Sequence, residues 1–251
     1  MKTALALSLA LAVACSRPPS SPPQAEHAAA PKPAPFAPVS PTFAPISAAP
    51  VSPARMCVTT GALEPHGDAL AVRVPEMRAI VAGDASNAAE LRFTYLGPSA
   101  GVAPLAHGEV RRQIGLKLRA QDTCNVVYVM WRIEPTPEIV VSVKRNAGKS
   151  IHLQCGASGY DNLRATAGTQ PRPLRAGEAH VLGAELDGTT LRVDADGALA
   201  WQGTLPPDAF AFDGPAGVRS DNGAFDFALH TSSASSSPLP CPAHSHTATR
   251  D

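Results

Sequence analysis

A polar surface able to bind a ligand is predicted near the middle of the chain. Residues 127–133 alternate apolar and other side chains, with Trp131 in one set and Tyr128 in the other, which predicts a strand with one buried and one polar face. The next segments add polar side chains to that second face. Rings, amides and cationic groups can together stack on a ligand and hydrogen-bond its polar groups. An ordinary solvated sheet face has a similar composition, and this alternative stays open. The candidate binding residues are Tyr128, Arg132, Lys144, Asn146, His152 and Gln154.

Residues suited to hydrolysis are less evident. Glycoside hydrolysis needs two carboxyl groups placed about 5 to 9.5 Å apart on either side of the bond. Glu134 and Glu138 bracket a proline-containing turn, and Asp194 and Asp196 lead directly into a glycine turn. Each pair is more typical of a hairpin end than of a catalytic site. We therefore predict no catalytic residues.

No closed metal site is predicted either. His244 and His246 would supply only two ligands from the end of the chain. Calcium needs six to eight oxygen ligands, whereas Asp194 and Asp196 offer two carboxylates. We expect no cofactor, with Ca²⁺ at Asp194 or Asp196 as the alternative.

Strands must position the polar surface, because from about residue 69 the chain shows short segments of period two and almost no helical periodicity. A second such segment places Lys117 opposite Leu116 and Leu118. Asp187-Gly188, Asp196-Gly197 and Asn222-Gly223 are strong hairpin signals. Ten or more antiparallel strands are predicted, arranged as an all-β sandwich of two sheets. Strands are expected at 139–146, 151–155, 182–186, 191–195, 199–203 and 225–229.

A longer segment carries a family resemblance. HVLGAELDGTTLRVDADGALAWQGTL, followed by GPAGVRSDNGAFDFAL, lies between His180 and Leu229. It resembles the C-terminal half of concanavalin A-like, laminin-G-like jelly rolls. This resemblance implies a jelly-roll sandwich, which we place at residues 56–231. The superfamily includes sugar-binding modules, laminarinase-type glycosidases and 3-keto-disaccharide hydrolase-like domains, and the fold alone does not choose among them.

Three functions follow as expectations. The first is binding of a carbohydrate or another envelope polymer by the polar sheet face. The second is glycan hydrolysis of the 3-keto-disaccharide hydrolase type. The laminarinase-like members carry a Glu-x-Asp-x-x-Glu strand motif, and this sequence has no such run. The third is a structural adaptor for another envelope protein, which would need a contiguous apolar surface patch.

The N-terminus predicts export and anchoring. Lys2 precedes an eleven-residue apolar run at 4–14, which is typical of a signal peptide and too short to span a bilayer. The run LAVAC resembles the lipobox of bacterial lipoproteins, which implies lipid attachment at Cys15, and Ser16 then favours the outer membrane. We expect a cell-envelope protein facing the periplasm or the exterior. Ordinary cleavage that discards Cys15 is the alternative.

The segments beside the sandwich are expected to be disordered. Residues 16–55 hold 12 of the 26 prolines among Ala and Ser, a composition that cannot build a core and suits an extended linker. Residues 232–251 are expected to form a tail that contains one cysteine. A net charge of zero argues against a nucleic-acid partner. Within the sandwich, 111–149 is basic and 180–229 is acidic, so a basic surface attractive to acidic glycans is expected if these halves lie apart.

Four cysteines remain after the leader, enough for two disulfides in an oxidising compartment: Cys57, Cys124, Cys155 and Cys241. If residues 125–155 form a three-strand meander, Cys124 and Cys155 lie at its opposite ends, too far apart to bridge. Their pairing is therefore the least expected. Pairing of Cys57 with Cys124, or with a cysteine near the C-terminus, stays open.

Overall fold

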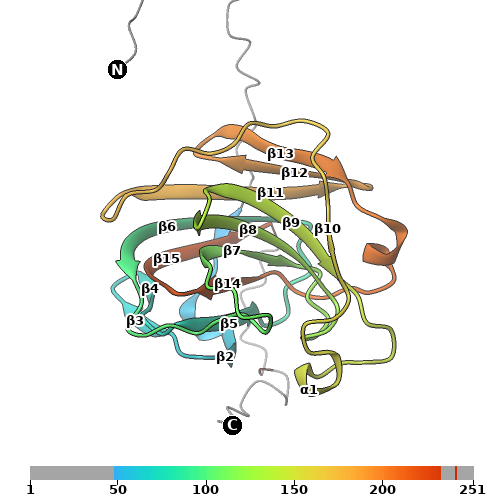
Figure 1. The fold of residues 1–251 in the computed structure, drawn as a ribbon, viewed down its shortest axis with the longest axis horizontal. Coiled ribbons are helices and arrows are strands. Elements are labelled where there is room, and N and C mark those ends of the chain that lie inside the picture. Colours follow the sequence, from blue (N-terminus) through green and yellow to red (C-terminus); the bar gives the residue numbers. More distant parts are fainter. Residues whose placement is uncertain (1–47, 233–240, 242–251) are drawn as a thin grey trace, which may run out of the picture. The chain divides into compact units, whose positions relative to one another are not determined.

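In the computed structural model, residues 48–232 and Cys241 are described, and they form two antiparallel sheets packed face to face (Figure 1). The predicted all-β sandwich is confirmed. Sheet A has eight strands, in the order β13 (Ala198–Thr204), β12 (Thr190–Ala195), β11 (Ala179–Asp187), β6 (Ala88–Pro98), β15 (Gly223–Thr231), β4 (Ala69–Val72) and β3 (Glu64–His66), with β1 (Ala49–Pro50) paired to β15. Sheet B has seven, in the order β10 (Tyr160–Asn162), β9 (Glu138–Lys144), β8 (Val126–Glu134), β7 (Arg112–Leu118), β14 (Gly217–Asp221), β5 (Glu76–Val81) and β2 (Met56–Thr60). The helices are short: α1 (His152–Cys155) and two 3₁₀ helices, η1 (Pro53–Arg55) and η2 (Pro207–Phe210).

The core lies between the sheets and confirms the alternation predicted for β8. Trp131 is fully buried, and its ring meets Phe93 of sheet A edge-on at 5.8 Å between centroids. Phe225 packs against Phe93 from the neighbouring strand β15. Tyr128 lies outside this core, in a smaller cluster on the other side of sheet B. One face of sheet B therefore packs in the core, and the side chains of the opposite, outer face do not take part in it.

Strands from the C-terminal part of the chain complete both sheets. β14 lies between β5 and β7, and β15 lies between β4 and β6. These pairings join strands that are more than 90 residues apart in sequence. They place Arg219 and Asp221 of β14 in the middle of sheet B.

Two of the three predicted hairpins are confirmed. Gly188 and Gly197 have positive φ, and their turns join β11 to β12 and β12 to β13. The hairpin at Asn222-Gly223 is wrong, because β14 and β15 belong to different sheets. Asn222 has a φ of 54° at this crossing. Its side-chain amide donates to the carbonyls of Ala103 and Arg111, which fixes the crossing to a neighbouring loop.

The strand expected at 151–155 is also wrong. The backbone N–H of Gly156 donates to the carbonyl of His152 across a single helical turn, α1. Only β8 and β9 therefore lie between Cys124 and α1, and two antiparallel strands return the chain to the end where it began. Cys124 and Cys155 are consequently 5.8 Å apart at Cα and form a disulfide, which corrects our expectation that this pairing was the least favoured. Cys57 pairs with Cys241, the C-terminal alternative.

Described residues before the expected boundary at Met56 already belong to the sandwich. β1 pairs with the end of β15, and Arg55 is buried with its guanidinium donating to the carbonyl of Ala82. Residues 48–55, which we placed in the linker, thus contact the sandwich. Cys15, the leader and most of the linker and tail lie outside the described residues.

Within residues 48–232, no helix has the length and apolar character needed to cross a membrane.

Candidate ligand-binding site

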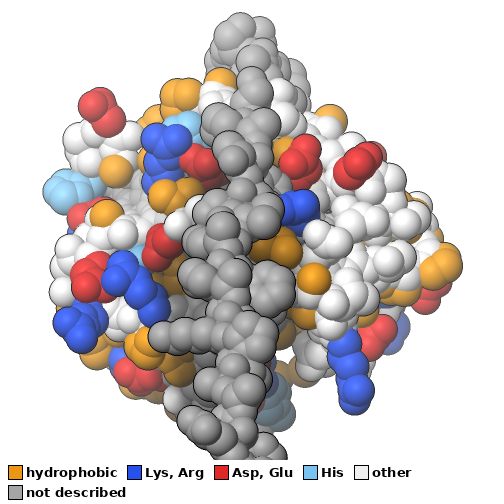
Figure 2. All heavy atoms as spheres, turned by 90° about the horizontal axis from the view of Figure 1, so that it is seen from above, with side chains coloured by type: hydrophobic (Ala, Val, Ile, Leu, Met, Phe, Trp, Pro, Cys, Tyr) orange, Lys and Arg blue, Asp and Glu red, His pale blue; other side chains and the backbone are white. Residues whose placement is uncertain are grey.

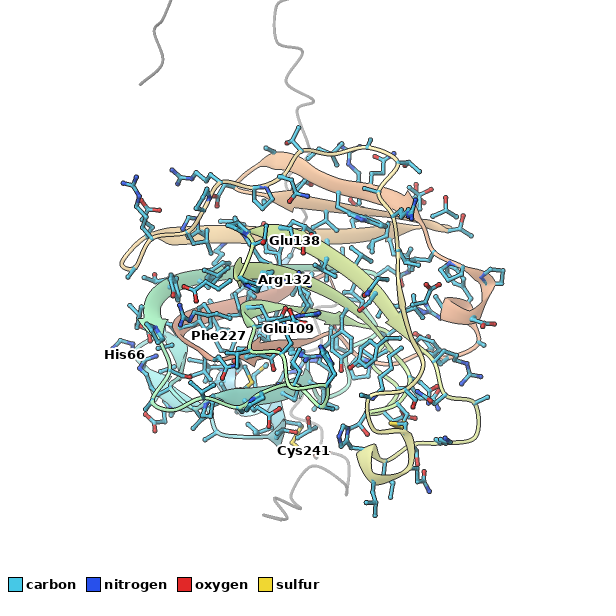
Figure 3. All side chains as sticks on the ribbon, in the orientation of Figure 1. His66, Glu109, Arg132, Glu138, Phe227 and Cys241 are labelled. Atoms are coloured by element: carbon cyan, nitrogen blue, oxygen red, sulfur yellow. A yellow bond between two sulfur atoms is a disulfide. The ribbon has the colours of Figure 1, made fainter. Side chains whose placement is uncertain are left out.

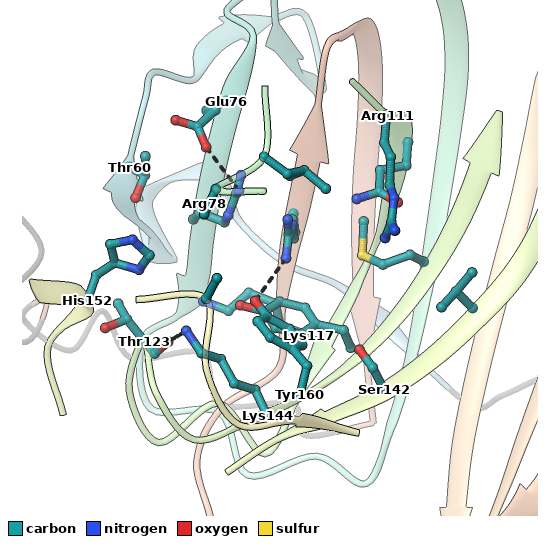
Figure 4. A pocket seen from close by; sticks show the side chains of 18 of the residues that line it. Thr60, Glu76, Arg78, Arg111, Lys117, Thr123, Ser142, Lys144, His152 and Tyr160 are labelled. Carbon is teal, nitrogen blue, oxygen red and sulfur yellow. Dashed lines mark hydrogen bonds and ion pairs between the residues drawn. The ribbon is translucent and has the colours of Figure 1, made fainter. Parts of the chain in front are cut away.

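A pocket of about 510 Å³ opens on the outer face of sheet B (Figure 4). This volume lies within the ~300–1,000 Å³ typical of ligand sites. Side chains of β5, β14, β7, β8, β9 and β10 form its floor, and α1 and the loop at 104–107 contribute walls. We call it the sheet B pocket.

Cross-strand register decides which side chains meet there. Arg219 on β14 pairs with Arg78 on β5 and with Gly115 on β7. The guanidinium of Arg219 lies 4.9 Å from the centre of the Tyr128 ring on β8, so this side chain extends across β7. Two residues after Gly115 on β7, a row of four polar side chains crosses four successive strands: Lys117, Tyr128, Ser142 and Asn162.

Two tyrosines form the aromatic part of the pocket. Tyr128 is only 5% exposed, because Arg219 and Tyr160 both pack against its ring. Tyr160 stacks on Tyr128 at 6.0 Å between centroids and is itself 41% exposed. Burial raises the pKa of Tyr128 to about 12, so its hydroxyl stays protonated. Tyr160 is therefore the ring available to a ligand, and Tyr128 supports it from below.

A buried ion network holds the two arginines in place. Asp221 is 1% exposed and lies 2.8 Å from Arg78 and 2.9 Å from Arg219. The side-chain amide of Gln113 also donates to it, at 2.6 Å. Burial by itself raises the pKa of Asp221, but Arg78, Arg219 and Gln113 outweigh burial and hold this pKa below its ordinary value. The carboxylate stays ionised and fixes both guanidinium groups.

Two buried lysines face the same space. Lys144 donates to the carbonyls of Thr123 and Gly156, and burial lowers its pKa to about 8. Lys117 is 4% exposed and has no hydrogen-bond or ion-pair partner among the described residues. Burial, together with the positive charges of Arg78 and Arg219, lowers the pKa of Lys117 to about 7.

Glu109 does not line the pocket but holds two of its lining residues, His107 and Arg111, in place. Glu109 accepts hydrogen bonds from Arg111 at 2.6 Å and His107 at 3.0 Å. These bonds lower the pKa of Glu109 to about 2. The network fixes Arg111 and the 104–107 loop as a wall.

Three of the six predicted binding residues line the pocket: Tyr128, Lys144 and His152. The other three do not line it. Arg132 pairs with Glu138 at the end of the β8–β9 hairpin (Figure 3). Asn146 donates to the carbonyls of Cys124 and Ser158, and Gln154 accepts from the backbone of Ser150. The chain beyond Lys144 is a loop and a helical turn rather than a continuing strand. Asn146 and Gln154 therefore do not lie on the sheet face, and their side chains stabilise the segment between β9 and β10.

The sequence prediction missed four charged or aromatic residues that line the pocket: Arg78, Lys117, Tyr160 and Arg219. Lys117 was assigned to the polar side of its strand, and Arg78 alternates with buried Met77 and Ala79 in the same way. The missing information was the strand order, since nothing local indicates that β14 joins β5 to β7.

The predicted separation of charge is partly present. The basic strands β7 to β9 lie in sheet B, and β11 to β13 and β15, from the acidic segment, lie in sheet A. β14 breaks this division by carrying Arg219 and Asp221 into sheet B. Basic and acidic side chains are interspersed on the face of the molecule seen in Figure 2.

Acidic side chains are scarce in the sheet B pocket. Of the described residues that line it, only Glu76 is acidic, and it lies 3.3 Å from Arg78. At the position of the calcium alternative, Asp196 accepts hydrogen bonds from the ring of His180 and the backbone of Val181. No cluster of three or more His, Cys, Asp or Glu side chains suited to a metal occurs in the described part of the chain.

No family model matches this chain, and no curated protein matches it. Among solved structures, the carbohydrate-binding module CBM66 from Bacillus subtilis is similar with a TM-score of 0.50 and 11% identity, over 69% of this chain and 91% of that chain. A galectin from Caenorhabditis elegans has a TM-score of 0.37 and 14% identity, over 73% and 99%. A family GH16 endo-β-1,3(4)-glucanase has a TM-score of 0.45 and 10% identity, over 72% and 86%. The strand order and the first similarity define the class of fold: an antiparallel jelly-roll sandwich of the concanavalin A-like type.

Proposed function

We propose that this chain binds a carbohydrate or another polymer of the cell envelope in the sheet B pocket. The observation that carries the proposal is the pocket itself, which lies on the outer face of a jelly-roll sheet. It combines a partly exposed tyrosine, Tyr160, with polar side chains. Ligand sites combine an apolar surface with a few fixed polar groups in this manner. The similar Bacillus subtilis structure is a carbohydrate-binding module, which agrees with this assignment.

The lining residues suit a sugar. The part of the Tyr160 ring that Tyr128 and Lys144 leave exposed can pack against a pyranose, while Asn162 and Ser142 are positioned to hydrogen-bond its hydroxyl groups. Burial, with the positive charges of Lys144 and Arg78, lowers the pKa of His152. At neutral pH its imidazole is therefore uncharged and can both donate and accept a hydrogen bond.

Replacing Tyr160 and Asn162 together by alanine is expected to weaken glycan binding at least tenfold, because the stacking ring and an amide are both lost. The full chain would first be screened on an array of defined oligosaccharides. Affinity for the strongest ligand would then be measured by calorimetry. Asp161→Ala is the matched control, since Asp161 lies between these residues on β10 but does not line the pocket. Equal binding by the double variant and the control, or an array with no bound glycan, would contradict the proposal.

The two alternatives make different predictions. A hydrolase would shorten the bound glycan, and Glu76→Gln would abolish this turnover, because Glu76 is the one acid among the described lining residues. Recovery of intact glycan after prolonged incubation supports binding alone. An adaptor would bind another envelope protein while the glycan array stays blank.

We also propose that Cys15 carries a lipid that anchors the protein in the cell envelope, facing the periplasm or the exterior from the outer membrane. The supporting observations are the short apolar leader, the LAVAC run and Ser16. More than one acyl chain gives stable anchoring. Cys15→Ser is expected to release the protein from the membrane fraction, and mass spectrometry should find a diacylated Cys15 at the new N-terminus of the unaltered protein. An unmodified or absent Cys15 in the membrane fraction would exclude the anchor.

A further inference from the structure

We propose that the deep part of the sheet B pocket is a subsite for an anionic group on the bound sugar, with Lys117 as its main ligand. A carboxylate, a sulfate and a phosphate share the chemistry required. The inference rests on the proposed function and specifies the class of glycan: acidic rather than neutral.

The first argument is the balance of charge. Four cations line this part of the pocket, Arg78, Lys117, Lys144 and Arg219. Three carboxylates oppose them: Asp221, Glu76 and Asp122, the last of which acts on both lysines without contacting them. Arg78 contacts Asp221 and Glu76, and Arg219 contacts Asp221. The two lysines are left without a carboxylate contact. Buried charges are normally paired, so the excess indicates a negative group that is supplied from outside.

The second argument separates the two lysines. Lys144 donates to two backbone carbonyls, which hold its ammonium in place over the Tyr160 ring. Lys117 is equally buried but donates to no described residue, and it lies on the pocket floor opposite Tyr128. All three N–H donors of Lys117 are therefore available to a ligand.

The third argument is the shape of the donor set. Arg219 uses its Nε on Asp221 and its Nη1 on the Tyr160 hydroxyl, while its Nη2 donates to none of the described residues. Asp221 fixes this guanidinium, and Arg219 belongs to β14, the strand next to the β7 strand of Lys117. An ammonium and a guanidinium N–H at neighbouring positions suit a group with two or three anionic oxygens. Lys117 and Arg219 thus form the proposed subsite, which we call the anionic seat.

The protonation of Lys117 should then control the preference for acidic sugars. Its pKa of about 7 in the free protein leaves it charged below neutral pH and uncharged above it. We expect the preference for D-glucuronate over glucose to fall as the pH rises from 6 to 8.5. Lys117→Gln should remove the part of this fall near pH 7 and leave the part near pH 8 that comes from Lys144. The titratable and charged groups that face Lys117 or share the pocket are Arg78 and Glu76 from β5, Arg219 and Asp221 from β14, Tyr128 from β8, Lys144 from β9, Tyr160 from β10, His152 from α1, His107 and Arg111 from the opposite wall, and Asp122 from the turn after β7.

Matched small probes test the seat on the full chain. D-glucose, D-glucuronate, glucose 6-phosphate and inorganic phosphate would be titrated while the lysine side chains are followed by NMR. The chain has five lysines, so the signal that disappears in Lys117→Gln assigns Lys117. Lys149→Gln is the control, because Lys149 is exposed outside the pocket.

D-glucuronate and glucose 6-phosphate are expected to shift the Lys117 signal and to bind at least tenfold more tightly than glucose at pH 6. In Lys117→Gln that ratio should fall to about twofold or less, with glucose binding retained. Equal binding of glucose and glucuronate by the unaltered protein would overturn the anionic seat and leave the glycan proposal standing. Binding of inorganic phosphate at Lys117, with no added affinity from any sugar, would support the seat and overturn the glycan proposal.

Discussion

Lys117→Met is expected to stabilise the folded protein by about 3 to 5 kcal/mol at pH 6. The ordinary pKa of this lysine is 10.5, and burial with the charges of Arg78 and Arg219 lowers its pKa to about 7 in the folded state. Each unit of difference corresponds to about 1.4 kcal/mol of free energy, which folding must supply to keep the ammonium buried and charged. Methionine fills a similar volume without a charge.

The pH dependence of this effect has a definite sign. Between pH 7 and 10.5 the unfolded chain binds more protons at Lys117 than the folded chain does, so the stability of the unaltered protein rises with pH in this window. Below pH 7 the full destabilisation is present. The advantage of Lys117→Met should therefore be largest at pH 6 and smaller at pH 9. Denaturant unfolding of both proteins at the two pH values measures it, with Lys149→Met as the exposed control. A loss of stability in Lys117→Met at pH 6, or an advantage that grows with pH, would contradict the assignment.

A residue that lowers stability yet lines a pocket is the expected sign of a functional site, because binding sites often retain strained or unpaired groups. Asp221 shows the opposite behaviour. It is the counter-ion of Arg219 and the shorter of the two carboxylate contacts of Arg78.

Asp221→Asn is expected to destabilise the fold by about 3 to 5 kcal/mol, since breaking a buried pair leaves uncompensated charge. The folded pKa of Asp221 is lowered, so its contribution is present above the ordinary value of 3.8 and is lost as the pH falls toward and below the folded pKa. The variant and the unaltered protein should become more alike in strong acid. Thermal or denaturant unfolding at pH 7 and pH 3 gives the comparison.

Asp226→Asn is the control for this effect. Asp226 lies on β15 of sheet A and pairs with Arg73 at 2.5 Å and with His66, but all three side chains are partly open to water. A pair of this kind contributes about 1 kcal/mol or less. If Asp221→Asn proves no worse than Asp226→Asn, the network under the pocket does not hold the arginines as we describe.

Local patterns in the sequence predicted the faces of the strands well. The alternation around Trp131 correctly placed Trp131 in the core and Tyr128 on the outer face, because a strand turns successive side chains to opposite sides. The turns at Gly188 and Gly197 were equally local, since positive φ at a two-residue turn favours glycine.

The pocket depended on information that is not local. Arg78 and Arg219 are neighbours because β14 pairs with β5, a contact between residues 141 positions apart. The segment containing Arg219 was visible as part of a family pattern, yet nothing in it indicated which sheet it joins. Asn222 was misread for the same reason: positive φ suits a hairpin and a crossing between sheets alike.

The segment after β9 shows how one wrong element misplaces several residues. Treating 151–155 as a strand put His152 and Gln154 on one sheet face and separated Cys124 from Cys155. A short apolar run does not distinguish a strand from a helical turn. Because residues 152–155 form α1 instead, Cys124 and Cys155 are close enough to form the disulfide, and His152 lines the pocket. Gln154 accepts a hydrogen bond from the backbone of Ser150.

The most direct test of the central claim is to map where an acidic sugar binds. Backbone amide NMR of the full chain during titration with D-glucuronate would show which residues respond. We predict that the shifted amides surround Lys117, Tyr160 and Asn162 on the outer face of sheet B. Shifts confined to sheet A, or no shifts at any concentration of the sugar, would contradict the claim that this pocket is the binding site.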